Sequence, residues 1–191
     1  MSPVIPIRAP RAPEIGILDL QGGIQEHLDH LERLGIDARR IKTADALSDV
    51  AGLILPGGES TCIARLLAIF GLDQVILREV RRGMKLWGTC AGTILVAKTL
   101  VGEPAHLGLI DITVERNGFG SQLDSFAAEA VIPKVSPDPI PLTFIRAPKI
   151  THAGPGVEIL LQIDDYIAAA ESSDVLVTVF HPELTPCLAL H

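Results

Sequence analysis

The sequence has 191 residues, of which 48% are hydrophobic and 4% are aromatic, and its net charge is −7. This length is close to that of one domain and can bury a sizeable core, whereas an acidic chain without a basic cluster argues against nucleic acid as a partner. No apolar run reaches the roughly 18 residues that span a membrane, and three cysteines do not make a disulfide framework, so we expect a protein of the reducing cytosol.

The first half of the chain alternates between short apolar runs and helical patterns. Residues 1–13 are rich in proline and lack the apolar core of a signal peptide, so we expect an irregular extension before one domain at 14–191. Apolar runs predict strands at 15–20, 38–41, 53–55 and 85–87. Helical spacing and glycine breaks predict helices at 24–34, 44–50, 73–82 and 91–100, and a further helix capped by Ser60 or Thr61.

The pattern changes after residue 107, where apolar segments typical of strands follow one another with few helices between them. Asp164 and Asp165 fit a hairpin turn, and we expect the proline-rich segment 133–141 to be a loop.

Strand–helix alternation with short turns, as in the first half of the chain, is typical of a parallel sheet covered by helices. The predicted fold class is therefore α/β with three layers: a mostly parallel central sheet, flanking helices and antiparallel strand additions.

Cys90 lies between Gly88 and Gly92, where a predicted strand turns into a predicted helix. This is the layout of a nucleophile elbow, in which small neighbours permit a sharp turn. A helix N-terminus also favours thiolate over thiol, and the Ala91 N–H would face an oxyanion formed at an attacked carbonyl. The alternative is a buried structural cysteine, which is common.

His181 and Glu183 follow a predicted strand at 175–180. Residues two apart on an extended segment point to the same side, so Glu183 could hold one imidazole nitrogen while the other accepts the proton of Cys90. A solvated His-Pro-Glu loop is the alternative. The segment Pro56-Gly57-Gly58-Glu59 adds a glycine turn whose Gly58 N–H could be a second oxyanion donor; a plain strand–helix turn is the alternative there.

Taken together, these residues resemble the class I, or triad-type, glutamine amidotransferases. The closest resemblance is to the glutaminase subunits of two-subunit pyridoxal 5′-phosphate synthase, and it covers about residues 15–185. Its motifs, in order, are LQGGIQEH (20–27), LILPGGEST (53–61), GTCAG (88–92), HLGLIDITVERNGFGSQLDSF (106–126), FIRAPKI (144–150) and FHPELT (180–185).

The resemblance implies a flavodoxin-like fold and hydrolysis of L-glutamine to glutamate and ammonia. It implies a nucleophile at Cys90, triad partners at His181 and Glu183, and an oxyanion hole from the amides of Gly58 and Ala91. It further implies glutamine-binding positions at Gly58, Glu59, Ser60, Arg116, Ile145 and Arg146.

The same resemblance implies no metal and no organic cofactor. It implies ammonia transfer to a (β/α)₈-barrel synthase subunit, which builds pyridoxal phosphate (vitamin B6), and weak activity of the glutaminase alone. A surface ion pair is the alternative for either arginine.

The sequence departs from the family pattern at a few places. Asp19 stands where the family usually has Ala or Gly, and Cys62 replaces a common Thr. The chain stops six residues after Thr185, where relatives usually continue into a last helix. We interpret Cys62 as a helix residue rather than a second nucleophile and Cys187 as a free thiol, and we expect His27 and His30 on a solvated or partner-facing helix surface rather than at a metal site.

Two other functions remain open from the sequence. One is a different cysteine hydrolase on the same kind of sheet, such as a γ-glutamyl hydrolase, although the VERN and FIRAP segments favour the glutaminase. The other is a non-catalytic binding module, which a complete set of Cys90, His181 and Glu183 argues against.

Overall fold

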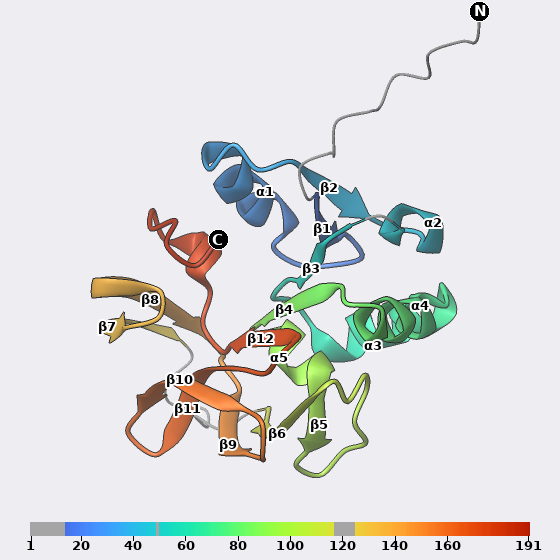
Figure 1. Ribbon diagram of the computed structural model, residues 1–191. Coiled ribbons are helices and arrows are strands. Elements are labelled where there is room, and N and C mark those ends of the chain that lie inside the picture. The colour runs from blue at the N-terminus through green and yellow to red at the C-terminus, as the bar shows by residue number, and fades with distance from the viewer. Residues whose placement is uncertain (1–13, 49, 117–124) are drawn as a thin grey trace, which may run out of the picture.

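The computed structural model describes residues 14–48, 50–116 and 125–191. The extension predicted at residues 1–13 and part of the VERN motif segment lie outside these residues. A central mixed sheet runs through the molecule in the order β2-β1-β3-β4-β12-β11-β9-β6-β5, and β10 pairs with β11 beside this path. Figure 1 shows the sheet with helices on its sides.

The N-terminal half of the sheet is parallel. Strand β1 (Ile15–Leu18) pairs with β2 (Ala38–Ile41) and β3 (Gly52–Leu55), and β4 (Lys85–Thr89) pairs with β3 and with β12 (Val175–Thr178), all in parallel. The predicted strands are confirmed here, with bounds that differ by one or two residues. The carboxyl ends of parallel strands meet at one edge, where open α/β sheets bind ligands.

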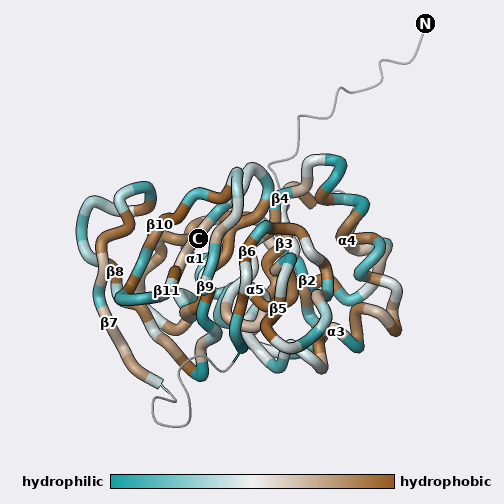
Figure 2. The backbone as a smooth tube through the Cα atoms, turned by 90° about the horizontal axis from the view of Figure 1, so that it is seen from below, coloured by the Kyte–Doolittle hydropathy of each residue, from teal (hydrophilic) through white to brown (hydrophobic). Residues whose placement is uncertain are grey.

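Helices cover the two faces of the parallel strands because apolar residues alternate along them. Ile17, Ile54 and Trp87 pack on one face under α1 (Ile24–Arg33), whereas Leu18, Leu53 and Leu86 belong to the core on the other face. That second face is covered by α2 (Ala44–Leu47), α3 (Ser60–Ile69), α4 (Leu72–Arg81) and α5 (Ala91–Val96). Figure 2 shows hydrophobic segments running along the inner strands.

The C-terminal half adds antiparallel strands, as the sequence predicts. Strand β11 pairs antiparallel with its neighbours, and the turn at Asp164 and Asp165 joins it to β10, with Ile163 opposite Tyr166. The remaining strands of the main sheet are β5 (Ala97–Leu100), β6 (Ile110–Glu115), β9 (Lys149–Ala153), β10 (Glu158–Ile163) and β11 (Tyr166–Glu171). A 3₁₀ turn, η2 (Pro182–Leu184), follows β12.

Two predicted elements are wrong. The helix predicted at 91–100 ends at Val96, and Ala97–Leu100 instead forms β5, which pairs in parallel with β6. The proline-rich loop is largely strand: β7 (Ser125–Ile132) and β8 (Ser136–Ile145) form a separate two-stranded sheet. In a two-stranded sheet each strand pairs on one side only, which leaves room for residues such as proline that have no N–H to donate.

Among the described residues, no single helix is long and apolar enough to cross a membrane. Helices α3 and α4 have the length and the apolar composition of a membrane span only when they are counted together, and they are bent by 89° at the break between them.

Candidate active site

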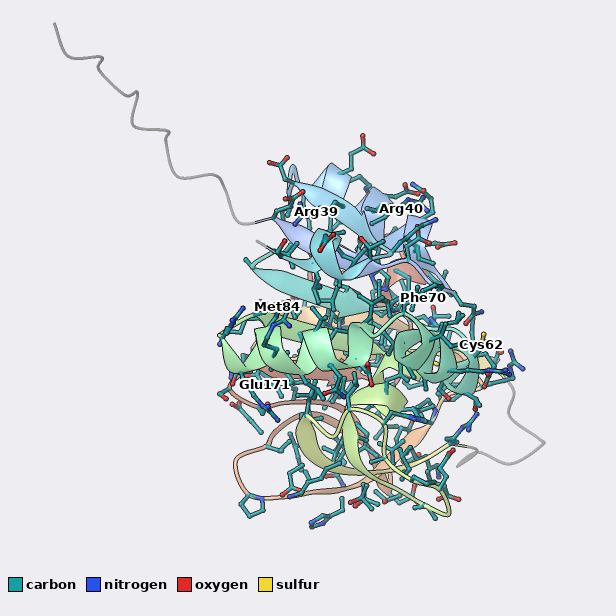
Figure 3. All side chains as sticks on the ribbon, turned by 90° about the vertical axis from the view of Figure 1, so that its right-hand side faces the viewer. Arg39, Arg40, Cys62, Phe70, Met84 and Glu171 are labelled. Carbon is teal, nitrogen blue, oxygen red and sulfur yellow. The ribbon has the colours of Figure 1, made fainter. Side chains whose placement is uncertain are left out.

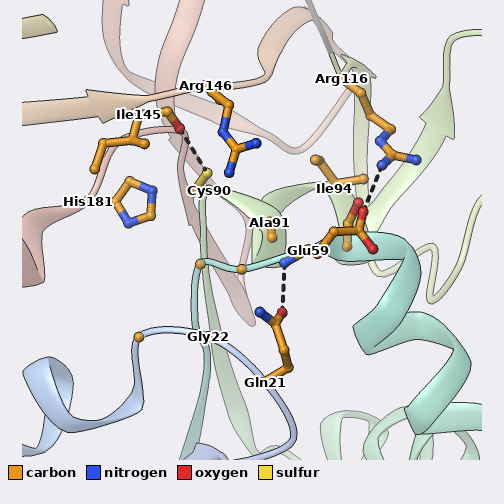
Figure 4. A pocket seen from close by; sticks show the side chains of 14 residues that line it. Gln21, Gly22, Glu59, Cys90, Ala91, Ile94, Arg116, Ile145, Arg146 and His181 are labelled. Carbon is orange, nitrogen blue, oxygen red and sulfur yellow. Dashed lines mark hydrogen bonds and ion pairs between the residues drawn. The ribbon is translucent and has the colours of Figure 1, made fainter. Parts of the chain in front are cut away.

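A pocket of about 370 Å³ opens where the parallel strands end. It brings together nearly every residue that the sequence singled out, together with several that it did not. Its lining residues are Gln21, Gly22, Gly23, Gly57, Gly58, Glu59, Ser60, Cys90, Ala91, Ile94, Arg116, Ile145, Arg146 and His181. Figure 4 shows Cys90 in this pocket near His181, Ile145 and Arg146.

Cys90 forms the N-cap of α5 with φ 48° and ψ −101°, a backbone conformation that is strained for a residue with a side chain. Such strain is typical of a nucleophile elbow. The predicted need for small neighbours beside Cys90 is confirmed, and neither flanking glycine has a positive φ. A Cβ on Gly88 would lie 2.6 Å from the Gly92 carbonyl, and one on Gly92 would lie 2.1 Å from the Leu55 carbonyl oxygen. The glycines therefore permit close packing of the helix start on the strands, and Cys90 itself takes the unusual dihedral.

His181 connects the thiol to a buried carboxylate. Its Nδ1 lies 2.6 Å from Oε1 of Glu183, whose side chain is 1% exposed, and its ring lines the same pocket as Cys90. Burial alone would lower the pKa of His181, but the hydrogen bonds with Cys90 and Glu183 outweigh it and raise the pKa to about 10. The geometry thus favours an imidazolium held between a sulfur and a carboxylate. The solvated-loop alternative is wrong, because Glu183 is buried.

The glycine turn after β3 packs closely against His181 and against the segment that carries Gln21 and Gly23. A Cβ on Gly57 would lie 2.3 Å from Cε1 of His181, so only glycine lets the imidazole approach. The Gly57 carbonyl accepts a hydrogen bond from the Gly23 N–H at 3.1 Å. Since the C=O and N–H of a trans peptide point in opposite directions, the Gly58 N–H is turned away from Gly23. Gln21 Oε1 accepts a hydrogen bond from the Glu59 N–H at 2.7 Å and fixes the next peptide.

Glu59, rather than Ser60 or Thr61, is the N-cap of α3. Its carboxylate accepts hydrogen bonds from the N–H groups of Thr61 at 3.2 Å and Cys62 at 2.7 Å. Burial acts to raise the pKa of Glu59, but these hydrogen bonds and the nearby Arg116 lower it overall. The carboxylate therefore both starts the helix and anchors Arg116.

The two predicted arginines differ in their partners. Arg116 forms ion pairs with Glu59 at 3.1 Å and Glu103 at 3.0 Å, and it donates a hydrogen bond to Thr61. Within the part of the chain that the structure describes, Arg146 has no ion-pair partner, and Figure 4 shows its guanidinium directed into the pocket. Arg146 has φ 43° and follows Ile145, whose carbonyl oxygen lies 3.9 Å from Cys90 Sγ.

Several pocket residues had no role in the sequence interpretation. Gln21, Gly22 and Gly23 belong to the LQGG segment, which carried the family resemblance but no predicted function, and Ile94 comes from the first turn of α5. Glu103 pairs with Arg116 from a distant turn, and no sequence motif indicates it.

Comparison with known proteins agrees with this geometry. Residues 17–187 match the SNO glutamine amidotransferase family. The chain belongs to this family. Family relatives include the pyridoxal 5′-phosphate synthase subunit PdxT of Syntrophus aciditrophicus, 64% identical over 95% of this chain and 81% of the relative. The PdxT subunit of Ruminiclostridium cellulolyticum is 47% identical over 93% of this chain and 95% of the relative.

Solved structures agree on the fold of the family. A crystal structure of a glutamine amidotransferase matches with a TM-score of 0.88 and 39% identity, covering 93% of this chain and 94% of that one. The PurLQS structure from Thermotoga maritima matches with a TM-score of 0.67 at 18% identity, covering 91% of this chain and 89% of that one. The second likeness supports only the fold, whereas the first, together with the family match, confirms the predicted class I amidotransferase architecture.

The residues that depart from the family pattern have local explanations. Asp19 forms ion pairs with Arg40 and Lys42, each at 3.3 Å. Cys62 is an exposed residue of α3, and Figure 3 shows it at the outer edge of the helical layer. Cys187 is a free thiol of intermediate exposure.

Proposed function

We propose that this chain hydrolyses L-glutamine to glutamate and ammonia with Cys90, His181 and Glu183 as its catalytic triad. The observation that carries the proposal is the strained Cys90 at the start of α5, which shares the pocket with a His181 ring whose Nδ1 lies 2.6 Å from Glu183. Family membership and the PdxT relatives support the same reaction class.

The reaction begins when the Cys90 thiolate attacks the side-chain amide carbon of glutamine. The amides of Gly58 and Ala91 hold the oxyanion; the Ala91 N–H is available because the first N–H groups of a helix lack intrahelical partners. His181 gives its proton to the nitrogen as the C–N bond breaks, which releases ammonia and leaves a thioester. Water then attacks the thioester, His181 takes its proton, and the C–S bond breaks to give glutamate and restore the thiolate.

Substrate recognition follows from the partners of the pocket residues. Arg146, which has no ion-pair partner among the described residues, is placed in the pocket (Figure 4) to bind the α-carboxylate of glutamine, because a guanidinium binds carboxylates with two parallel hydrogen bonds. Arg116 is already paired with Glu59 and Glu103, so its part is to order the loop that carries Glu59 and Ser60. Ile145 contributes its backbone at the pocket wall.

The ammonia is passed to a synthase partner that makes pyridoxal 5′-phosphate. Relatives are named as subunits of that synthase, which supports a complex with a synthase subunit. We further propose that this partner is a (β/α)₈ barrel and that the complex works in the cytosol.

Ammonia release from L-glutamine, measured with and without the synthase subunit, tests this function. We expect release from the complex and its loss in Cys90→Ala, while the Cys90→Ala chain still co-purifies with the synthase. The exposed cysteine variant Cys62→Ala is the matched control and keeps its activity. Release of glutamate only from γ-glutamyl peptides would favour a γ-glutamyl hydrolase, and no release from glutamine in the complex would overturn the proposal.

A further inference from the structure

The two oxygens of Glu183 have very different surroundings. Oε1 lies 2.6 Å from His181 Nδ1. Oε2 is buried and, within the described residues, has no hydrogen-bond partner. It faces Nε2 of His27 at 3.6 Å, slightly beyond hydrogen-bond distance. A buried carboxylate oxygen without a partner is costly, so the group that faces it helps to fix the position of the Glu183 carboxylate.

His27 is fully buried, contrary to the expected solvated helix surface. It comes from α1, and its Nδ1 lies 2.8 Å from Nε2 of His191, whose Nδ1 lies 3.1 Å from Nδ1 of His30. Trp87 packs edge-on against both His27 and His191. Figure 1 and Figure 2 both show the C-terminal end beside α1. The three histidines thus form a row that ends at Glu183.

The row is made of neutral rings. Burial, followed by the neighbouring His191, His30 and His181, holds the pKa of His27 well below its usual value. Burial also lowers the pKa of His30, and it lowers that of His191 to about 3. A neutral imidazole has one donor and one acceptor nitrogen. The negative charge of Glu183 favours the tautomer of His27 with its proton on Nε2, so that Nδ1 accepts from His191 and the N–H faces the carboxylate.

We propose that His27 is a positioning residue for catalysis: its Nε2–H faces Oε2 of Glu183 and orients that carboxylate toward His181. This inference rests on the proposed role of Glu183 in the triad. A neutral donor suits the task because it stabilises the carboxylate without adding a positive charge that would compete with the His181 imidazolium.

Other groups around Glu183 do not replace this contact. The titratable neighbours are His181 on Oε1, His27 on Oε2, and His30 at longer range from the same helix as His27. Glu26 reaches the space beside Gly23 that Glu183 Oε1 also borders, and its negative charge gives no support to a second carboxylate. From β4, Thr89 Oγ1 lies 3.4 Å from His27 Nε2. Among the described residues, no group of His, Cys, Asp or Glu could hold a metal ion, so the row is not a metal site.

Three substitutions of one residue test the proposal. The amide nitrogen of Gln occupies the place of histidine Nε2, that of Asn occupies the place of Nδ1, and Met matches Gln in length but has no donor. We expect His27→Gln to keep most of the kcat for glutamine in the synthase complex. His27→Asn and His27→Met should lose kcat by about 10- to 100-fold, as is typical when a residue that supports a catalytic group is removed, with little change in KM.

The pH dependence separates positioning from general damage. The hydrogen bond with Glu183 helps to raise the pKa of His181, so a displaced carboxylate lowers that pKa, and the alkaline limb of kcat/KM should move down by about one pH unit in His27→Met and His27→Asn but not in His27→Gln. A merely loosened core would lower activity equally at all pH values. Thermal unfolding of all three variants identifies any that fails to fold, and the polar pair Gln and Asn remains comparable if Met does not.

A second readout does not depend on glutaminase activity. The rate at which iodoacetamide alkylates Cys90, followed by mass spectrometry of its peptide, reports the thiolate that His181 stabilises. We expect the pH profile of this rate to change in the same two variants and to stay unchanged in His27→Gln. Equal kcat and equal alkylation profiles for Gln, Asn and Met would overturn the role of His27. Absence of ammonia release from the unmodified complex would instead overturn the proposed function, whatever the alkylation profiles show.

Discussion

His181 and His27 lie on opposite sides of one carboxylate, yet their charges differ. Both are largely buried, and each faces one oxygen of Glu183. His181 has hydrogen bonds with Cys90 and Glu183 that favour its charged form, and its pKa is raised to about 10, whereas His27 has other histidines as neighbours and its pKa is lowered. Closeness to a carboxylate does not by itself make a histidine cationic; short hydrogen bonds to the charged form must outweigh burial.

Replacing the carboxylate that lies between His181 and His27 should have the largest effect on activity. In Glu183→Gln the charge that stabilises the His181 imidazolium is gone, and the amide no longer fixes the ring tautomer. We expect kcat to fall by about 10³- to 10⁴-fold, as in other triads that lose this charge, with glutamine KM changed far less.

The matched control for this change is Glu171→Gln. Glu171 pairs with Lys134, which lies outside the pocket lining, so this variant should keep the activity of the unmodified complex. Nearly full kcat in Glu183→Gln would show that the carboxylate is not a triad member.

A smaller loss comes from moving His181 without changing its chemistry. A methyl group in Gly57→Ala would lie 2.3 Å from the His181 ring, so the imidazole must shift away from Cys90. A displacement of about 1 Å costs on the order of 10²-fold in rate. Gly52→Ala, in the preceding strand, meets only a side-chain end at 3.3 Å and a carbonyl oxygen at 3.5 Å, and its kcat should stay near that of the unmodified chain; equal values for both variants would contradict the steric argument.

The side of the site around His181 was predictable from sequence because its residues directly follow strands. Cys90 and the Gly57–Gly58 turn end buried apolar runs whose period reveals the strands, and parallel strands place their ends together. His181 and Glu183 were predicted as a pair because two residues apart on an extended segment share a side.

The side around His27 was not predictable in this way. Helical spacing places His27 and His30 on α1, but it does not reveal that η2 and His191, more than 150 residues away, cover that face.

The two wrongly predicted elements have the same cause, because their structure depends on strand partners that lie elsewhere in the chain. Ala97–Leu100 leaves the helical pattern because β6 offers it a strand partner, and the prolines near 137–141 are accepted by a two-stranded sheet.

The two arginines at the substrate end of the pocket should affect different kinetic constants. Arg146→Ala removes the guanidinium that is directed into the pocket (Figure 4), and we expect glutamine KM to rise about tenfold, the equivalent of one lost charged hydrogen bond, with kcat changed less. Arg116→Ala should lower kcat as well, because Glu59 loses its partner and the glycine turn loosens. Steady-state kinetics of the complex measure both, and a rise in KM for Arg116→Ala alone would reverse the two assignments.

The smallest expected effect lies in the pH dependence of stability, where the two histidines act in opposite directions. The folded pKa of His181 is raised, so its contribution is complete below about pH 6.5 and is lost as the pH rises toward 10. The folded pKa of His27 is lowered, so its contribution is present above about pH 6.5 and is lost as the pH falls, because the unfolded chain binds a proton that the folded chain excludes. His30 and His191 act on the same acidic side. Denaturant unfolding across pH 5–10 should therefore give a maximum near neutrality, and each ring that titrates should add up to about 1.4 kcal/mol per pH unit to the slope on its side, so that the acidic slope is the steeper. His181→Gln should flatten only the alkaline slope and His27→Gln should reduce only the acidic one. Loss of both slopes in either variant would mean that the two rings titrate as one unit rather than as a charged and a neutral partner of the same carboxylate.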